Sequence, residues 1–541
     1  MNPLPRPAAA LAAVLLAAGA VTAGPPADAR ALADKVDEHL ARRWATASVQ
    51  PAAPADDAEF LRRVYLDLAG RIPTVAEART FLNDQRPDRR ARLVDELLSG
   101  PRYPAHFSNV WRALLLPEAG NNFQVRLQQG GFETWLKKQV ATNVAYDKMV
   151  RDLLTTPLGG GGPLALIAFT EPGPIPYYLA KEFKPENLAA GTARVFLGVN
   201  VECAQCHNHP FADWKREQFW AFAAFFSGVK SQRQQDFLLP DGEDAGKHSV
   251  TLPGTDKVIQ ARFLDGTAPS WEGDRSSRVV LAEWLTSKDN PYFARAAVNR
   301  LWAYFLGAGL VEPLDQLAGS PDTTGDTELL DLLAHEFAAH DFDVKFLIRT
   351  ITMTRAYQLS SARSHPGQDD ARLFARMPLR GLTGEQLFDS VAAATGFRDS
   401  GGGDDLLSGL VGGKRSARSE FLTRFALSER PTEAQTSILQ ALALMNGKVT
   451  ADATTLERSE TLAAVVDMPL ASNAQRVEAL YLATLSRKPT AKESERLVGY
   501  VRDAVRSAKG KDEAARHAAA ADALADVFWV LLNSPEFLIN H

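Results

Sequence analysis

FLRRVYLDLAGRIPTVAE, residues 60–77, predicts two short helices joined by a tight turn. In its first half, apolar residues recur every three or four positions, as they do on one face of an α-helix. They are Phe60, Leu61, Val64, Tyr65 and Leu68. Gly70 can end that helix in the left-handed conformation. Thr74 and Glu77 have the spacing of a capping box, which predicts that a second helix begins there.

The same pattern, Y-L-x(4)-R-x-P-T-x-x-E, occurs at residues 65–77 and again at residues 481–493. Two copies so far apart cannot form a solenoid, because a solenoid needs at least about three adjacent repeats. We interpret the pattern as one helical hairpin used twice. A paired docking element is the alternative interpretation.

Most of the remaining chain also has helical periodicity, so the sequence predicts a mainly α protein. Its 541 residues are too many for one hydrophobic core and suggest two helical domains with a small β-containing connector. Residues 248–265 are the one convincing β region, with two runs around a Pro-Gly turn. Residues 399–417, rich in Gly, Ser and Asp, predict a flexible insertion. The expected domains are 24–230, 231–275 and 276–541.

The only two cysteines of the chain lie together in Cys203-Ala204-Gln205-Cys206-His207. This C-x-x-C-H pattern is typical of c-type haem attachment. Two thiols three residues apart on a short helical turn can form thioethers with the two vinyl groups of one porphyrin, and the following histidine can reach the iron. We therefore predict that Cys203, Cys206 and His207 bind one covalent haem c, with His207 as the proximal iron ligand.

The second axial ligand is not defined by the sequence. Several methionines and histidines could supply it, giving Met/His or bis-His ligation respectively. The candidates are Met149, Met353, Met377 and Met445, and His106, His248, His335 and His340. An open sixth position would instead favour ligand or peroxide chemistry. Five aromatic residues after the motif could line a haem pocket, although core packing is their simpler role: Phe219, Trp220, Phe222, Phe225 and Phe226.

Two other chemistries remain open for the motif. A thioredoxin-like dithiol would use Cys203 as a thiolate after a short strand at 194–201, but the alternating β-α-β pattern is absent around it. A zinc site could use the two cysteines with His207 or His209 and a distant ligand, but the chain has no second C-x-x-C.

Two further polar groupings suggest sites only at first glance. His335 and His340 are five residues apart, which places them about 140° from one another on a helix, so they do not form an H-E-x-x-H metal site. Residues Asn299, Arg300, Trp302 and Asp315 could form a polar binding group. An arginine–aspartate pair within a helical core is the simpler interpretation of the second grouping.

Residues 1–23 have the features of a secretory signal peptide. One positive charge, Arg6, precedes an apolar run from Ala8 to Val21, and small residues suit cleavage after Ala23. That run is shorter than the roughly 18 residues of a stable membrane span, although an uncleaved anchor is the alternative. We expect export to the periplasm or the medium, which covalent haem attachment also requires, and no transmembrane segment beyond the signal peptide.

Composition limits the partners that we expect. The net charge of −5 gives no reason to propose nucleic acid or an anionic membrane as a partner. With both cysteines in one motif, none is left for a disulfide framework, so packing must stabilise the fold. A redox partner protein is expected if haem is bound, and the sequence defines no oligomeric state.

Several segments resemble the planctomycete-type cytochrome-c-like family, in which two domains of unknown function are paired. The segments are RRVYLDL (62–68), VNVECAQCHNHPF (199–211), NPYFAR (290–295), NRLW (299–302), RAYQLS (355–360), LQAL (439–442), MNG (445–447) and LNSPEF (532–537). The resemblance covers the mature chain and implies a helical, exported protein with a c-type haem site and no settled activity. Unlike many such proteins, this chain has no separate cytochrome domain upstream, and Asn208 stands where an acidic residue is common.

The sequence thus leads to one main hypothesis and two alternatives. The main hypothesis is an exported mono-haem c-type cytochrome-like protein that transfers electrons. The first alternative is a metal-binding or scaffold interaction protein without haem. The second is an extracytoplasmic oxidoreductase with an open haem iron, so enzymatic activity is left undecided.

Overall fold

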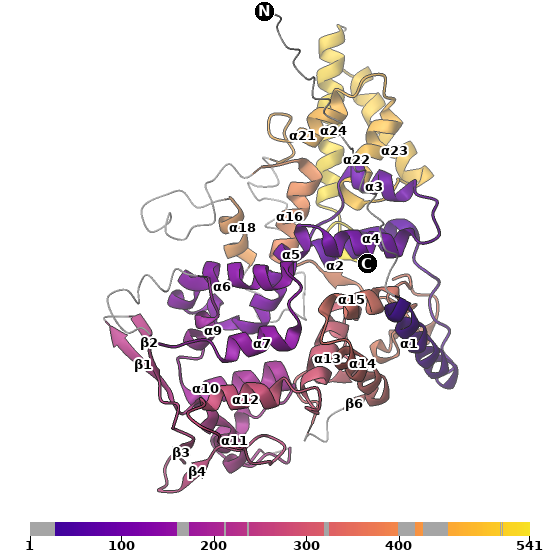
Figure 1. Cartoon of the computed structure of the whole chain (residues 1–541). Helices are drawn as coiled ribbons and strands as arrows, with labels where there is room; N and C mark the ends of the chain where they lie inside the picture. The colour runs from indigo at the N-terminus through magenta and orange to yellow at the C-terminus, as the bar shows by residue number, and fades with distance from the viewer. Residues whose placement is uncertain are drawn as a thin grey trace, which may run out of the picture.

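The computed structural model describes residues 27–159, 172–209, 212–234, 237–318, 324–398, 417–425, 453–508, 510 and 512–541 (Figure 1). The expected signal peptide, residues 1–23, lies outside the described residues. So does nearly all of the expected insertion at 399–417, because the description resumes at Ala417.

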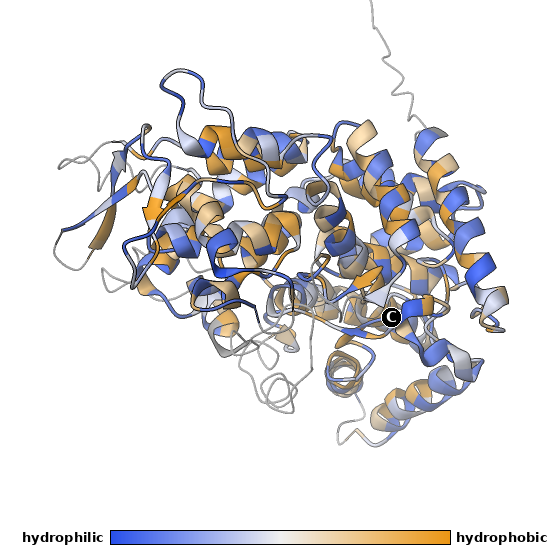
Figure 2. Cartoon of the chain, turned by 90° about the horizontal axis from the view of Figure 1, so that it is seen from below, coloured by the Kyte–Doolittle hydropathy of each residue, from blue (hydrophilic) through white to orange (hydrophobic). Residues whose placement is uncertain are grey.

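The described part of the chain is mainly α-helical, as the sequence predicts. The earlier helices are α1 (Ala27–Thr46), α2 (Asp57–Ala69), α3 (Val75–Leu82), α4 (Arg89–Ser99), α5 (Arg102–Leu115), α6 (Phe123–Ala141), α7 (Tyr146–Leu154), α9 (Ile175–Ala180), α10 (Pro185–Thr192) and α11 (Arg216–Ala223). The later helices are α12 (Ser277–Leu285), α13 (Phe293–Leu306), α14 (Thr327–Ala339), α15 (Val344–Met353), α16 (Gly384–Thr395), α18 (Ala417–Phe425), α21 (Glu460–Val466), α22 (Asn473–Leu485), α23 (Ala491–Arg506) and α24 (Glu513–Leu532). Many of them have one hydrophilic and one hydrophobic side (Figure 2).

Strands occur in the described residues as four two-stranded antiparallel pairs. Their bounds are β1 (Val229–Gln234) with β2 (Phe237–Glu243), β3 (Ser249–Thr251) with β4 (Val258–Gln260), β5 (Val311–Glu312) with β6 (Thr324–Gly325), and β7 (Arg380–Gly381) with β8 (Ile539–Asn540). The expected β region at 248–265 is confirmed as β3 and β4, in which Ser249 lies opposite Gln260. The longer pair, β1 with β2, is not predicted, because Pro240 and Gly242 interrupt the β2 sequence.

Two clusters of buried apolar side chains form the core. The first joins helices from α1 to α15, on both sides of β1–β4 in the sequence, and includes Leu482 of α22. The second joins α16, α18 and α21–α24 with Leu66 and Ile72 from the first hairpin. Since Leu61 and Val64 belong to the first cluster and Leu66 to the second, α2 connects the two.

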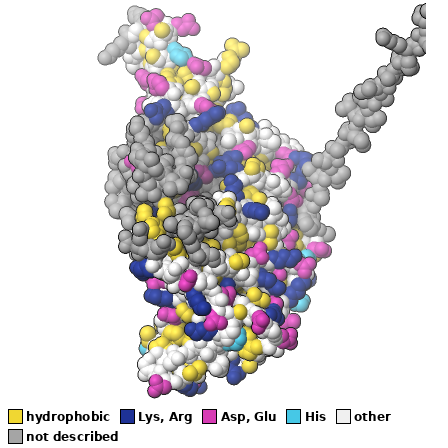
Figure 3. Space-filling model, turned by 60° about the vertical axis from the view of Figure 1, so that its left-hand side comes forward, with side chains coloured by type: hydrophobic (Ala, Val, Ile, Leu, Met, Phe, Trp, Pro, Cys, Tyr) yellow, Lys and Arg dark blue, Asp and Glu magenta, His cyan; other side chains and the backbone are white. Residues whose placement is uncertain are grey.

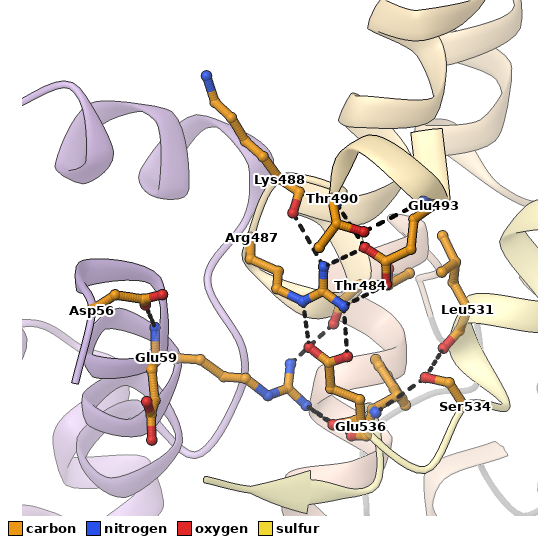
Figure 4. Close-up of polar contacts among 12 residues, drawn as sticks. Asp56, Glu59, Thr484, Arg487, Lys488, Thr490, Glu493, Leu531, Ser534 and Glu536 are labelled. Carbon is orange, nitrogen blue, oxygen red and sulfur yellow. Dashed lines mark hydrogen bonds and ion pairs between the residues drawn. The ribbon is translucent and has the colours of Figure 1, made fainter. Parts of the chain in front are cut away.

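Both copies of the predicted hairpin are present, and their turns have the same ion pair. Arg71 donates to the two carboxylate oxygens of Glu77 at 2.8 Å, and Arg487 donates to those of Glu493 at 2.9 Å. Arg487 also donates to the carboxylate of Glu536, at 2.7 and 2.8 Å (Figure 4). The second copy therefore holds the C-terminal segment as well as its own turn.

The backbone of the two copies follows the same course. Gly70 and Ser486 end α2 and α22 in the left-handed region, with φ of 67° and 60°. Thr74 and Thr490 form capping boxes at the starts of α3 and α23. The copies also meet, because α3 packs against α22 (Figure 1). This contact within the fold supports the interpretation of one structural hairpin used twice.

Three charged side chains of α2 are fully buried at the junction of the two clusters. Arg62 and Arg63 are 0% exposed and Asp67 is 1% exposed. Asp67 accepts hydrogen bonds from Arg380 at 2.9 and 3.0 Å and from the Tyr357 hydroxyl at 2.8 Å. These bonds tie α2 to segments roughly 300 residues later in the chain.

His106 of α5 belongs to the same junction and is buried in neutral form. The Tyr304 hydroxyl donates to the Asp67 carbonyl at 2.9 Å, so the His106 Nε2–H donates to Tyr304 at 2.7 Å. Gly70 packs so closely that a Cβ there would lie 2.5 Å from the His106 Nδ1 atom. Burial lowers the pKa of His106 to about 4.

We predict that this histidine makes the protein less stable in weak acid. In the unfolded chain His106 binds a proton near pH 6.5, whereas in the folded chain it binds one only near pH 4. The contribution of neutral His106 to the free energy of unfolding is therefore complete above pH 6.5 and is lost as the pH falls through 4. The loss is up to about 3 kcal/mol. Urea denaturation between pH 7 and 4 should show a shallower pH dependence for His106→Gln. An unchanged pH dependence contradicts the prediction, and exposed His335→Gln is the control.

On the face drawn in Figure 3, Lys and Arg side chains are interspersed with Asp and Glu side chains. Among the described residues, no helix has both the length and the apolar character that crossing a membrane requires.

Candidate functional site

The C-x-x-C-H turn lies in the segment that connects α10 to α11. After α10, residues Ala193–Leu197 form a short π-helix that ends at Gly198 in the left-handed region, with φ of 63°. A Cβ at Gly198 would lie 2.7 Å from the Leu317 Cδ1 atom, so glycine permits this close approach. The Leu317 amide donates to the Gly198 carbonyl at 2.9 Å. The segment before the turn is therefore fixed to the chain after α13.

Arg300 of α13 strengthens this connection. Its guanidinium donates to the carbonyls of Arg194 and Val195, at 2.5 and 3.3 Å. Both residues lie in the last turn of the helical segment, where carbonyl groups have no partner within the helix and a positive charge is favourable. The short strand at 194–201 that the dithiol alternative would need is not formed, because Ala193–Leu197 form the π-helix and Val199 makes an isolated bridge with Gln316. The dithiol interpretation thereby loses the strand that it requires.

The two cysteines are exposed and belong to one short turn. Glu202–Gln205 form a 3₁₀-helix that contains Cys203, and Cys206 caps its end. Both are free and exposed, whereas Ala204 between them is 0% exposed and faces the core. The turn thus presents two thiols on the surface.

The imidazole of His207 follows on the same exposed surface. Its Nδ1 atom lies 2.7 Å from the carbonyl oxygen of Asn208. Because a carbonyl can only accept, we assign the proton to Nδ1, which leaves the Nε2 lone pair available for a metal. The Asn208 side chain accepts from the Arg216 amide at 3.0 Å and so joins the turn to the first residue of α11.

Helix α11 is joined to the turn by side-chain hydrogen bonds. The Trp220 Nε1–H donates to the Gln205 carbonyl at 3.0 Å, and the Arg216 Nε–H donates to the same oxygen at 3.4 Å. The aromatic residues that could line a haem pocket are instead core residues, between 0% and 7% exposed: Phe219, Trp220, Phe222, Phe225 and Phe226. Their simpler role is confirmed.

His209 takes part in the loop after the turn. Its amide donates to the Trp214 carbonyl at 2.8 Å, and its Nδ1 atom accepts from the Ala212 amide at 2.9 Å. This ring therefore holds the loop that connects the cysteine turn to α11.

Three of the four candidate methionine ligands are buried, and the fourth lies outside the described residues. Met149 and Met377 belong to the first core cluster, and Met353 is 7% exposed. Met445 lies outside the described residues.

The histidine candidates are distributed over other elements. His106 bonds to Tyr304 in the core, and His340 stacks on Phe346 with ring centres 3.8 Å apart. His335 is exposed on α14. His248 bonds to Ser277 at 2.7 Å and stacks on Trp271. It directly precedes β3, and β3 packs on α11, the helix that follows the cysteine turn.

An ion pair between a buried lysine and a half-buried glutamate close to the turn was not predicted from the sequence. Lys181 is 6% exposed and pairs with Glu118, and burial lowers the pKa of its ammonium group. Its charge interacts with Arg194 and with Glu202, the residue before Cys203. Gly191 leaves room for the lysine, since a Cβ there would lie 2.7 Å from Lys181 Cε.

The remaining polar grouping of the sequence is structural. The Asn299 side chain bonds to both the amide and the carbonyl of Val311, at 3.0 and 2.7 Å. Arg300 bonds to backbone carbonyls. The negative charge of Asp315 acts on Arg300 electrostatically and favours its charged form. Trp302 is 0% exposed in the first core cluster. Among the described residues, no group of three His, Cys, Asp or Glu side chains is arranged to hold a metal ion.

Comparison with known families divides the chain at the β-containing segment. Residues 35–231, which include the cysteine turn, match the PSCyt2 model, described as a protein of unknown function (DUF1549). Residues 277–501 match the PSD1 model, described as a protein of unknown function (DUF1553). No curated protein and no solved structure matches the chain. The chain therefore fits a two-domain protein of unknown function, in which a PSCyt2-type segment precedes a PSD1-type segment.

Proposed function

We propose that this chain is an exported, mono-haem, c-type cytochrome-like protein that transfers electrons to a redox partner protein. One observation carries the proposal: Cys203, in a short 3₁₀ turn, and Cys206, which caps that turn, are both free and exposed, and exposed His207 follows directly. A single porphyrin presents two vinyl groups along one side, which is what two thiols of one short turn can reach.

The residues of the turn fit such a group. Cys203 and Cys206 would hold it through thioethers, and His207 would be the proximal ligand through Nε2. The bond from His207 Nδ1 to the Asn208 carbonyl fixes the plane of the ring and increases the basicity of Nε2. When bound, haem supplies a one-electron couple at its iron. Because the turn is exposed, a partner protein can approach it without opening the fold.

The covalent attachment is tested with the full chain, including residues 1–23, in a host that exports proteins and attaches c-type haem. After denaturation, a pyridine haemochrome spectrum should show about one covalent haem per chain, since the chain has one such motif. Cys203→Ala combined with Cys206→Ala should show none. His335→Ala, an exposed histidine on α14, should retain the haem of the wild type.

Two outcomes would overturn the proposal. One is wild-type protein from the competent host without covalent haem. The other is covalent haem that persists in the double cysteine variant. Stoichiometric zinc that is present in the wild type and lost in the double variant would support the metal-binding alternative without haem.

An extracytoplasmic oxidoreductase with an open sixth position is the second candidate. It is supported by three of the candidate axial ligands: Met149 and Met377 are buried in the first core cluster, and His106 is buried and bonds to Tyr304. Carbon monoxide binding to the reduced protein distinguishes the two functions. Rapid binding with a large spectral change supports the open iron, whereas an unchanged spectrum supports a six-coordinate electron carrier.

A further inference from the structure

A second candidate site lies in the C-terminal helices, at the end of the molecule opposite α11 (Figure 1). A cavity of about 380 Å³ lies among α21–α24. This volume is within the range of small-molecule sites, which starts at roughly 300 Å³. Five of its lining residues carry or can carry positive charge: Arg476, Arg502, Arg506, Arg516 and His517.

The floor of the same cavity is apolar. Val466 of α21, Val505 of α23 and Leu524 of α24 line it. Glu513 is the acidic residue among the lining side chains. The cavity therefore offers an apolar surface below and a surplus of cationic groups around it.

These cations are only weakly neutralised by the protein. Arg502 and Arg506 share one carboxylate, Asp503, at 3.4 and 3.8 Å, and their side chains are 56% and 71% exposed. Arg476 donates to the carbonyls of Val465 and Met468, both at 3.2 Å, and so uses part of its guanidinium to end α21. Within the described residues, Arg476 forms no ion pair.

Arg516 is the most informative of the five. It lies close to the start of α24, where the helix dipole disfavours a positive charge, and it forms no ion pair with a described residue. The cations at the end of α23 have a simpler explanation, because that end of a helix favours positive charge. No such explanation covers Arg516, whereas its neighbour His517 pairs with Asp467 at 3.4 Å.

We infer that this cavity binds a small amphipathic anion, with a phosphate, sulfate or carboxylate head and an apolar body. The guanidinium fork matches the oxygen pairs of all three heads. The apolar floor formed by Val466, Val505 and Leu524 would bury the body. The inference uses no residue of the cysteine turn and does not depend on haem.

The inference is tested by calorimetric titration of the full-length protein with phenyl phosphate, phenyl sulfate, benzoate and, as a neutral probe with a similar body, benzyl alcohol. We expect at least one of the anions to bind, with an affinity that falls as salt rises, and benzyl alcohol to bind more weakly. The order of the three anions identifies the head. Inorganic phosphate should also bind more weakly than phenyl phosphate, because it lacks the apolar body.

Variants locate the binding. Arg502→Gln with Arg516→Gln should weaken binding roughly tenfold or more, since each removes a charge-assisted hydrogen bond. Arg496→Gln, on the same helix as Arg502 but outside the cavity, should leave the affinity unchanged. Ala520→Trp, which fills the cavity from its wall, should also abolish binding.

Far-UV circular dichroism confirms that each variant is folded before titration. The inference is overturned if none of the anions binds, if benzyl alcohol binds as well as the anions, or if the double arginine variant and Ala520→Trp both bind like the wild type. None of these results bears on haem attachment, which is read separately from the haemochrome spectrum.

Discussion

Replacement of Asp67 by alanine is expected to destabilise the protein by roughly 3–5 kcal/mol, the usual cost of breaking a buried ion pair by removing one partner. The Asp67 carboxylate is 1% exposed and accepts bonds from Arg380, Tyr357 and Asn540. Without it, the Arg380 cation loses its counter-charge, and two neutral donors lose their acceptor. Burial alone would lower the pKa of Arg380, and Asp67 is what raises it.

The loss is measured as the shift in the urea denaturation midpoint, followed by far-UV circular dichroism. Asp331→Ala is the matched control, because Asp331 pairs with Arg295 at 3.2 Å while remaining 57% exposed. An exposed pair contributes at most about 1 kcal/mol, so the control should shift little. Equal shifts for the two variants would contradict the role assigned to Asp67.

Arg62→Met is expected to have an effect of similar size and to act first on the C-terminal segment. The Arg62 guanidinium is fully buried and donates to the carbonyls of Thr484, Glu536 and Phe537 at 3.0, 3.2 and 2.8 Å. Burial lowers its pKa to about 10, so it remains charged near neutral pH. Methionine fills a similar volume but leaves these carbonyls without a donor, at about 1–3 kcal/mol for each that stays buried.

Hydrogen exchange reports this change locally. Amides of the segment that contains Glu536 and Phe537 should exchange faster in Arg62→Met, while amides of α13 in the first core cluster should change less. Arg62→Lys should be destabilised too, because an ammonium group cannot span carbonyls that a planar fork reaches. Exposed Arg86→Met is the control. Uniformly faster exchange across both clusters, with no preference for the C-terminal segment, would refute the local role.

The sequence predicts the features that depend on neighbours along the chain. The capping boxes at Thr74 and Thr490 and the hairpin of β3 with β4 need only a few adjacent residues, and all are present. The two copies of Y-L-x(4)-R-x-P-T-x-x-E likewise specify the same turn twice, since each arginine meets its own glutamate within one hairpin.

The buried charges could not be predicted, because they depend on partners far away in the chain. By periodicity alone, Arg62 and Asp67 fall outside the apolar face of α2 and would be placed in solvent. Asp67 is buried where it meets residues 357, 380 and 540, and Arg62 where it meets residues 484, 536 and 537. The one hint in the sequence is the density of charge, with Arg62, Arg63 and Asp67 in a segment that is otherwise apolar.

For the candidate site, the sequence identifies the cysteine turn but not its surroundings. Cys203, Cys206 and His207 are contiguous, so their grouping follows from the motif. The π-helix before the turn was not predicted, and Val195, Phe196 and Leu197 have side chains that are common in strands. Their burial against α13, with Arg300 bonding to the free carbonyls, outweighs that preference.

Mass spectrometry of one tryptic peptide tests the central claim most directly. Cleavage after Arg194 and Lys215 releases residues 195–215, which contain both cysteines and His207. From protein made in a host that attaches c-type haem, this peptide should carry the added mass of one haem. A peptide with two unmodified thiols, or with a disulfide between Cys203 and Cys206, would contradict the proposed cytochrome function.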